Sequence, residues 1–286
     1  MTPVRVSPSW LAVREPADVA ARAGALVDEI RHSLPADRPL VIYDLGCGTG
    51  ATMRWLAPQL PGPQHWIGYD LDAHLLATFN AAPAQVAADG SPVTTETRCR
   101  DVTQLKAGDL ADATLITCSA LLDLLSADEL DRLVRSCASA RCPVLITLTV
   151  TGAVRLSPRH PLDELVAAAF NSHQRRTTGG RRLLGPDAAD AARRMFTELG
   201  CDVVGHASPW RLGPARRQLT YAWFAGWLAA ACEQDSHLAT ATRSYARVRL
   251  AGASAGRLQA LVQHRDLLVR SPRRPGQPDA DRPRTR

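Results

Sequence analysis

The chain has 286 residues, of which 45% are hydrophobic, and its formal net charge is +6. This length and composition are ordinary for a globular protein and exclude a fibrous or wholly disordered chain. No run of about 18 apolar residues predicts a membrane span, and residues 1–10 lack the apolar core of a signal peptide. We therefore expect a cytoplasmic protein that has no membrane partner.

The positions of the cysteines and arginines indicate which kinds of site and partner to expect. The seven cysteines are scattered without a C-x-x-C pair, so the sequence predicts neither a disulfide framework nor a metal site. Residues 271–286 hold five arginines against two aspartates, which is +3 of the net charge of +6. This Pro/Arg/Asp segment is expected to be a disordered basic tail. The remaining charge is too small to predict a nucleic-acid partner.

The first half of the chain alternates strands and helices. An amphipathic helix is expected over residues 15–33, within an N-terminal helical cap of residues 1–35. Strands then follow at 40–44, 66–70, 93–99, 113–118 and 143–150, and helices at 49–60, 71–81 and 127–139. Such alternation is typical of a parallel sheet with right-handed crossovers.

The pattern changes after residue 150. Helices are expected at 162–171, 186–199, 217–233 and 240–262, and strands at 201–206 and 265–269. We expect residues 36–270 to form one domain with insertions at 151–185 and 207–263. Tryptophans at helical spacing on residues 217–233 predict packing against the sheet or a partner chain, so a homo-oligomer is compatible with the sequence.

A glycine-rich segment, Asp44-Leu45-Gly46-Cys47-Gly48-Thr49-Gly50, directly follows the first strand. Glycines at this place let the backbone turn tightly and approach a ligand. The spacing G-x-G-x-G differs from the G-x-G-x-x-G of dinucleotide sites. An acid two residues before the first glycine suits a cationic ligand better than a pyrophosphate, which it would repel.

Two further acids follow the next two strands. Asp70 ends the second strand, where nucleotide-binding folds place a carboxylate for ribose hydroxyls. Asp101 follows the third strand and can accept a hydrogen bond from an adenine amino group, with Val102 packed on the ring. Because parallel strands end at one edge of a sheet, the three acids are expected to line one crevice.

These motifs resemble those of class I S-adenosylmethionine-dependent methyltransferases of the small-molecule type. Residues 44–50 resemble motif I, residues 68–70 the motif II acid, and residues 117–120 the loop after strand four. The resemblance implies an α/β, Rossmann-like doubly wound sheet of seven mostly parallel strands, with helical additions at the N-terminus and after strands five and six. It implies S-adenosylmethionine as cofactor and S-adenosylhomocysteine as product. The cofactor-binding residues that it implies are Asp44, Gly46, Cys47, Gly48, Thr49, Gly50, Asp70, Leu71, Asp101, Val102 and Ser119.

Residues for a small-molecule methyl acceptor are sought after strands four, five and six. A general base is needed only if the acceptor is protonated. The candidates for that role are His173, in a basic loop with two glycines that could close as a lid, and Asp123, on a short leucine-rich helix. The candidates for binding the acceptor are His160, Arg175, Trp210 and Arg211.

Three other functions are weighed against a small-molecule methyltransferase. An RNA or protein methyltransferase is the second possibility, and nucleic acid is disfavoured because no Asn-Pro-Pro-Tyr-like segment follows strand four and no RNA-binding module is appended. A nicotinamide-linked oxidoreductase is disfavoured by the glycine spacing and Asp44. A cofactor-binding homologue without catalysis stays open, because methyl transfer requires no fixed set of catalytic residues.

Overall fold

A computed structural model describes residues 6–271 of the chain. The basic tail expected over residues 271–286 therefore lies, apart from Ser271, outside the described residues. Among the described residues, none of the helices combines the length and apolarity that a membrane span requires. All seven cysteines are described and none forms a disulfide.

The central sheet has its strands in the order β3-β2-β1-β4-β5-β10-β8. Neighbours among β1 to β5 pair in parallel, and β10 is antiparallel to both β5 and β8. This order confirms the expected doubly wound sheet, including a late antiparallel strand inserted beside strand five. The bounds are β1 Leu40–Leu45, β2 Gln64–Asp70, β3 Val93–Cys99, β4 Leu115–Ser119, β5 Val144–Ser157, β8 Asp202–Ala207 and β10 Gln259–Arg270.

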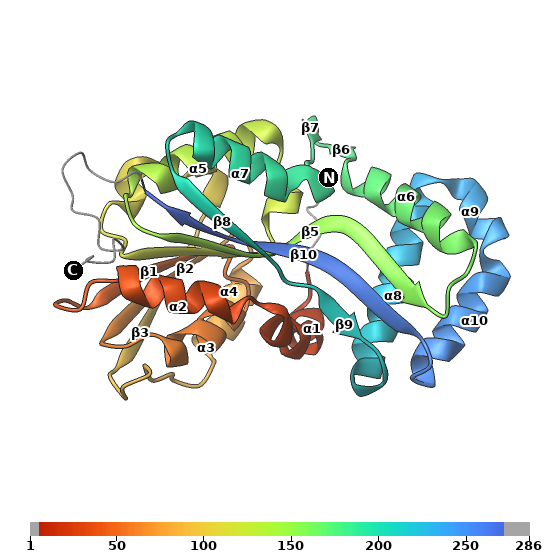
Figure 1. Cartoon of the computed structure of the whole chain (residues 1–286), viewed down its shortest axis with the longest axis horizontal. Coiled ribbons are helices and arrows are strands. Elements are labelled where there is room, and N and C mark those ends of the chain that lie inside the picture. The colour runs from red at the N-terminus through yellow and green to blue at the C-terminus, as the bar shows by residue number, and fades with distance from the viewer. Residues whose placement is uncertain (1–5, 272–286) are drawn as a thin grey trace, which may run out of the picture.

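Helices cover both faces of the sheet (Figure 1). One face carries α2 (Gly24–Ser33), α3 (Ala51–Leu56) and α4 (Ala73–Asn80). The other carries α5 (Ala127–Ser139) and α7 (Ala188–Glu198). Each helix buries an apolar stripe against the sheet, as Leu26, Val27 and Ile30 do from α2. The two resulting cores hold the carboxyl ends of β1, β2 and β4 rigidly at one edge.

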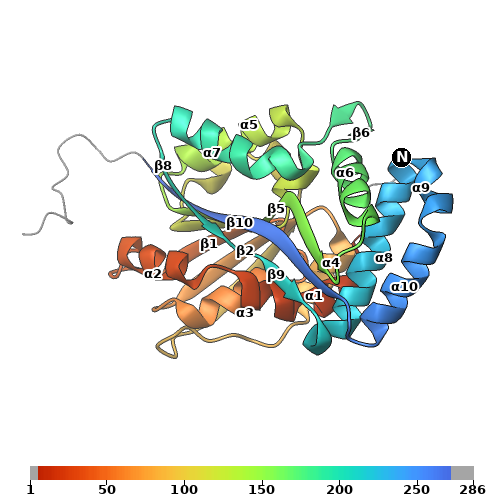
Figure 2. The ribbon, with the colours of Figure 1, turned by 45° about the vertical axis from the view of Figure 1, so that its right-hand side comes forward.

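A second, aromatic-rich part of the molecule lies beyond that edge (Figure 2). The ladder of β5 and β10 continues past the sheet, and β9 (Trp210–Leu212) pairs with the far part of β10. Around this ribbon pack α1 (Pro8–Ala21), α6 (Leu162–Gln174), α8 (Arg217–Gln234), α9 (Ser236–Ala241) and α10 (Arg243–Ser254). They share a third core centred on Phe224 and Trp227, which we call the aromatic core.

The expected helix over residues 15–33 is wrong, because the structure has two helices there. The chain turns at Arg22 and Ala23, where the Ala23 N–H donates to the Asp266 carboxylate at 2.9 Å. That bond replaces one within a helix, so α1 ends at Ala21 and α2 begins at Gly24. The first helix also begins earlier than expected, at Pro8, with Ser7 as its N-cap.

Strands five and seven are much longer than expected. The sequence predicted a strand ending at Val150 and a helix reaching Val262, whereas β5 runs to Ser157 and β10 begins at Gln259. The ladder is irregular midway, where Leu148 has a φ of 56° and its N–H donates to the Asp266 carboxylate at 2.7 Å. Such bulges bend a strand without ending it, which explains why local alternation did not reveal the continuation.

A small hairpin occupies the glycine-containing loop for which the sequence suggested the hypothesis of a lid. Strands β6 (Thr177–Thr178) and β7 (Arg181–Arg182) are joined by Gly179 and Gly180, both at positive φ. Its Arg181 guanidinium donates to the carboxylate of Glu129 on α5, at 2.6 Å. The tip of the hairpin is therefore tied to the sheet layer.

Candidate functional site

The glycine loop after β1 is tight because side chains leave no room there. A Cβ atom at Gly50, whose φ is 84°, would lie 2.5 Å from the Phe79 ring. A Cβ at Gly46, whose φ is 72°, would lie 3.0 Å from Leu121. The loop is also tied to β2, because the Gly48 N–H donates to Asp70 Oδ2 at 2.9 Å. Motif I thus needs glycine for both its conformation and its close packing.

Asp44 is a buried carboxylate at the end of β1. Its Oδ1 accepts a hydrogen bond from Thr117 Oγ1 at 2.8 Å, and its Oδ2 has no partner within residues 6–271. Burial raises the pKa of Asp44 to about 6, although the Thr117 hydroxyl and the nearby Arg22 charge act to lower it. One carboxylate oxygen is therefore available for a ligand.

Arg22, at the turn between α1 and α2, provides the opposite charge in the same place. Its Nη2 donates to Ser119 Oγ at 3.2 Å, and its guanidinium lies 4.8 Å from the centre of the Trp55 ring. The Nε and Nη1 atoms are buried and have no partner in the described part of the chain. Within the described residues, Arg22 and Asp44 do not form an ion pair with each other. Each side chain therefore has at least one buried polar atom that can still form a hydrogen bond with a ligand.

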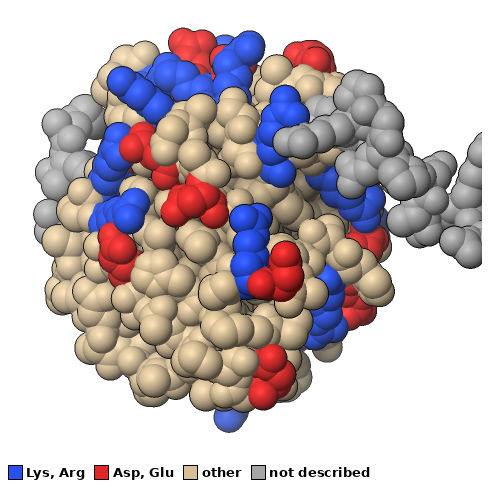
Figure 3. Space-filling model, turned by 90° about the vertical axis from the view of Figure 1, so that its left-hand side faces the viewer, with Lys and Arg blue, Asp and Glu red and all other residues tan. Residues whose placement is uncertain are grey.

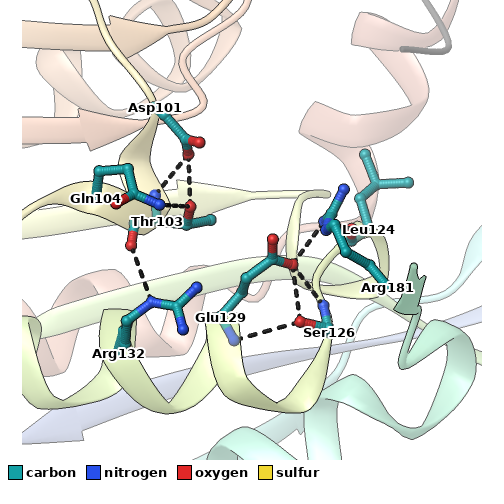
Figure 4. Close-up of polar contacts among 8 residues, drawn as sticks. All are labelled: Asp101, Thr103, Gln104, Leu124, Ser126, Glu129, Arg132 and Arg181. Atoms are coloured by element: carbon teal, nitrogen blue, oxygen red, sulfur yellow. Dashed lines mark hydrogen bonds and ion pairs between the residues drawn. The ribbon is translucent and has the colours of Figure 1, made fainter. Parts of the chain in front are cut away.

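The other two acids also lie at this edge. Asp70 accepts from the Gly48 N–H and, through Oδ1, from the Asp72 N–H at 2.9 Å, and each oxygen retains a lone pair. Asp101 caps a short turn, η2 (Val102–Gln104), by accepting from the N–H and hydroxyl of Thr103 through one oxygen (Figure 4). Its second carboxylate oxygen points away from Thr103. Both acids can therefore accept hydrogen bonds from a ligand.

Two implied cofactor residues differ from each other in exposure. The Leu71 side chain is 65% exposed, and Val102 is buried.

Cys47 is buried with its Sγ 2.8 Å from where a Cβ on Gly68 would lie, and burial raises the pKa of its thiol. The Cys47 side chain therefore fills space between the loop and β2, and only its backbone faces the loop's ligand side.

Helix α1 lies against the glycine loop. Leu11 is close enough that a Cβ on Gly48 would approach it to 3.2 Å. Glu15 accepts two hydrogen bonds from Arg54 of α3, at 2.7 and 2.6 Å. The Asp18 carboxylate accepts from Trp210 Nε1 at 2.9 Å. The helix is thereby attached to both parts of the molecule.

A cavity of about 170 Å³ adjoins α1 on the side of the aromatic core. Ala120 and Asp123, which follow β4, line it together with Leu148 of β5. Its remaining walls come from the far part of β5 and from α1, α6, α8, β9 and β10. Because Ala120 directly follows Ser119, which bonds to Arg22, the cavity begins beside the carboxylate edge of the sheet.

The structure brings two of the six expected catalytic and acceptor residues to this cavity. Asp123 and Trp210 line it. Burial raises the pKa of Asp123, with its own backbone N–H and the Arg14 charge acting to lower it. A carboxylate with a raised pKa is a stronger base, which suits it to accept a proton.

The other four expected residues have contacts elsewhere. His173 Nε2 lies 3.1 Å from Glu233, between α6 and α8, and burial and Arg176 lower its pKa. Arg175 makes a bidentate ion pair with Asp187. The His160 ring packs on Tyr245 at 4.9 Å, and Arg211 is exposed. None of these four is among the residues that line the cavity.

The sequence reasoning missed Arg14, Arg22 and His264. Arg14 and His264 line the cavity, and Arg22 faces Asp44. A signal was present in the N-terminal segment, where Trp10, Arg14, Asp18 and Arg22 recur at every fourth residue. That spacing places all four on one face of a helix, and charged residues on a face that packs inward indicate a site.

The sequence of residues 42–143 matches the model of a methyltransferase domain family. This match covers the segment that holds motif I, Asp70 and Asp101. Residues 42–143 are thus similar in sequence to a methyltransferase domain. Among the residues that the structure describes, no group of His, Cys, Asp and Glu is placed to hold a metal ion.

Solved structures show the same fold. The YcgJ protein from Bacillus subtilis has a TM-score of 0.50 and 12% identity, with 87% of this chain and 97% of that chain covered. The cyclopropane synthase MmaA2 from Mycobacterium tuberculosis has a TM-score of 0.51 and 13% identity, with 93% and 95% covered. At these identities the likeness concerns the fold alone. No curated protein matches the chain.

Proposed function

We propose that this methyltransferase moves the methyl group of S-adenosylmethionine to a small molecule held in the cavity beside α1. The observation that carries the proposal is the pair of buried, incompletely bonded groups at the carboxylate edge, Arg22 and Asp44. Buried polar atoms normally find partners. A guanidinium beside a carboxylate matches the carboxylate and ammonium of an amino acid, which is one end of this cofactor.

The remaining residues fit the rest of the cofactor. Asp70 would hold the ribose hydroxyls, Asp101 the adenine amino group, and Val102 one face of the ring. The glycine loop leaves room for the backbone to approach the ligand closely. When bound, the cofactor supplies a methyl group on a positively charged sulfur, which is open to in-line displacement.

The protein's own part is to position the acceptor and exclude water. The walls of the cavity, from α1 and from segments 151–185 and 207–263, would seat the acceptor. Asp123 would accept a proton from an acceptor that carries one. We assign no catalytic part to His173, because its contacts are with Glu233 and Arg176 outside the cavity.

The charge on one face of the molecule does not support a nucleic-acid partner. On the face that Figure 3 shows, Lys and Arg side chains are interleaved with Asp and Glu. Nucleic-acid sites instead gather basic residues on one surface.

Reduced cysteines are the rule in the cytoplasm, so the absence of disulfides among the seven cysteines supports the cytoplasmic location that we propose.

Calorimetric titration with S-adenosylhomocysteine, S-adenosylmethionine and NADH tests this function. We expect micromolar affinity for both sulfur nucleotides and none for NADH. The Asp70→Ala variant should lose the binding, and Asp28→Ala, a change at an exposed position of α2, should keep it. Binding of NADH alone, or equal binding by the Asp70 variant, would show that the site has been assigned wrongly.

A further inference from the structure

The cavity beside α1 is unusually rich in tryptophan. Four of the six tryptophans of the chain line it, namely Trp10, Trp210, Trp223 and Trp227. Trp223 and Trp227 are stacked, with ring centres 5.6 Å apart and planes 21° from parallel. Flat walls of this kind favour a flat ligand, because aromatic rings prefer offset or tilted contact with one another.

The size of the cavity limits the ligand to about one ring. Its volume is about 170 Å³. An apolar cavity of about 150 Å³ in another protein holds one benzene molecule. A ring with one or two small substituents therefore matches this volume.

Charge in the walls disfavours a cationic ligand. Arg14 already lies over the Trp210 ring, 4.9 Å from its centre, which uses the face that a cationic ligand would occupy. The Arg14 charge also acts to lower the pKa values of His264 and Asp123, so its positive field reaches the cavity. A second cation would be repelled there.

An anionic ligand is matched poorly too. Asp18 accepts hydrogen bonds from Arg14 Nε at 2.9 Å and Nη2 at 3.2 Å, so these two donors of the arginine are already used. His264 is buried, and burial and the Arg14 charge lower its pKa to about 3, which leaves the ring uncharged at neutral pH. A carboxylate ligand would be repelled by Asp123, while Arg14, the basic side chain in the lining, already gives two of its donors to Asp18.

The end of the cavity nearest the proposed cofactor residues is polar, and Gln174 and Gln263 add polar side chains elsewhere in its walls. Asp123 lines the part that begins at Ala120, next to the carboxylate edge of the sheet. Its carboxylate can accept a hydrogen bond from a hydroxyl. His264 lines the cavity from β10, and its ring packs on Trp210 with centres 5.1 Å apart. The cavity therefore combines flat apolar walls with a hydrogen-bond acceptor at the end nearest the cofactor residues.

We propose that the acceptor is an uncharged aromatic hydroxyl compound of about one ring, with its ring between the tryptophans and its hydroxyl at Asp123. This proposal rests on the proposed function. Asp123 takes the hydroxyl proton while the acceptor oxygen forms its bond to the methyl carbon. The carbon–sulfur bond breaks and its electron pair stays on sulfur, which becomes a neutral thioether. The proton that Asp123 takes balances the positive charge that the sulfonium has lost.

Four probes of similar size test the acceptor class: 4-ethylphenol, phenyltrimethylammonium, 4-ethylbenzoate and 1-hexanol. Each is titrated calorimetrically into the full chain, with and without saturating S-adenosylhomocysteine. We expect 4-ethylphenol to bind at least about tenfold more tightly than each of the other three. Equal or tighter binding of the cation, the anion or the aliphatic alcohol overturns the proposal, and so does binding of none of the four.

Variants locate the binding and assign the proton acceptor. Trp223→Leu should weaken 4-ethylphenol binding by about tenfold, and Tyr221→Leu, at an exposed position of the same helix, should leave it unchanged. Asp123→Asn keeps a hydrogen-bond acceptor, so binding should hold while methyl transfer to 4-ethylphenol falls by about a hundredfold. An unaffected Trp223 variant, or an unaffected rate in the Asp123 variant, overturns the corresponding part of the proposal.

The experiment separates this proposal from the proposed function. If S-adenosylhomocysteine fails to bind, the proposed function is wrong, whatever the probes do. If it binds and the probes rank otherwise than expected, the cofactor assignment stands and the acceptor class is wrong.

Discussion

The cofactor edge of the sheet and the aromatic cavity differ in how the chain builds them. The cofactor edge comes from strand ends within residues 40–119, and the residues that we propose to bind the cofactor there are glycines and acids placed by local motifs. The cavity comes from segments between Trp10 and His264, and its walls are mostly aromatic. Helix α1 contacts both, through Leu11 and Glu15 on one side and Arg14 and Asp18 on the other.

Short motifs therefore place the residues proposed for the cofactor, whereas contacts between distant segments build the cavity proposed for the acceptor. A motif such as residues 44–50 fixes backbone shape and charge within a few residues. The cavity instead depends on a ribbon of β5 and β10 that projects past the sheet and on helices packed around it. If this division is real, changes in one region should leave the binding properties of the other largely intact.

The largest expected effect tests whether the aromatic core stabilises the fold without shaping the cofactor edge. Phe224 is fully buried and contacts Trp227 and Tyr245, with ring centres 5.9 and 5.7 Å away. Phe224→Ala should lower the free energy of unfolding by about 3–5 kcal/mol because it leaves a cavity. Urea denaturation measures this loss. The folded variant should bind S-adenosylhomocysteine like the wild type, and a large loss of that affinity would show that the two regions are one unit.

Asp44 is expected to lower the stability of the free protein at neutral pH and to strengthen cofactor binding. Its pKa of about 6 lies above the ordinary value of 3.8, so the folded state holds its proton more tightly than the unfolded chain does. The stability that this gives is complete below pH 3.8 and is lost as the pH rises through about 6. Asp44→Asn should therefore stabilise the free protein by about 3 kcal/mol at pH 8, and by about half as much at pH 5.

The same variant should bind S-adenosylhomocysteine about a hundredfold more weakly, because an amide cannot pair with an ammonium group. Asp28→Asn on the exposed side of α2 is the matched control for both measurements. A variant that is less stable at pH 8, or that keeps full affinity, would contradict the account of Asp44 as a desolvated ligand.

Arg22 allows a sharper test of which end of the cofactor lies where. Arg22→Met keeps an unbranched side chain beside Trp55 and removes the charge. Affinity for S-adenosylhomocysteine should fall by about tenfold, and affinity for 5′-methylthioadenosine, which lacks the amino-acid end, should not change. Calorimetry with both ligands measures the difference, with Arg31→Met on α2 as control. Equal losses for the two ligands would place Arg22 away from the amino-acid end.

The smallest expected effect concerns the attachment of α1. The Glu15 and Arg54 side chains are 23% and 24% exposed, so solvent screens part of their interaction. Glu15→Gln should lower stability by about 0.5–1 kcal/mol and should speed release of S-adenosylhomocysteine about twofold to threefold, since α1 covers Gly48. Stopped-flow displacement measures the release rate. Asp28→Gln, which breaks an exposed ion pair with Arg31, should not change it.

The same difference between local and long-range contacts explains which features of the structure could be predicted from the sequence. The order of seven strands and the positions of Asp44, Asp70 and Asp101 at one edge were predictable, because each depends on short periodic segments and a local motif. The length of β5 was not, because the bulge at Leu148 depends on a bond to Asp266, more than a hundred residues away in sequence. A local pattern cannot indicate such a partner.

The acceptor residues show the same limit. His173 was the preferred base on account of its polar neighbours, yet those neighbours orient it toward Glu233 of α8. His264 lies in a strand of alternating residues and reaches the cavity only because β10 continues past the sheet. Arg22 could have been found from the spacing of charged residues in the first helix, which was interpreted only for its apolar positions.

A crystal structure of the chain with S-adenosylhomocysteine tests the central claim most directly. The account predicts the ligand's carboxylate within hydrogen-bonding distance of Arg22, its ammonium at Asp44, its ribose at Asp70 and its adenine beside Asp101. It also predicts that the sulfur faces the cavity at Ala120 and Asp123. A ligand bound elsewhere, or one whose sulfur faces away from that cavity, would contradict it.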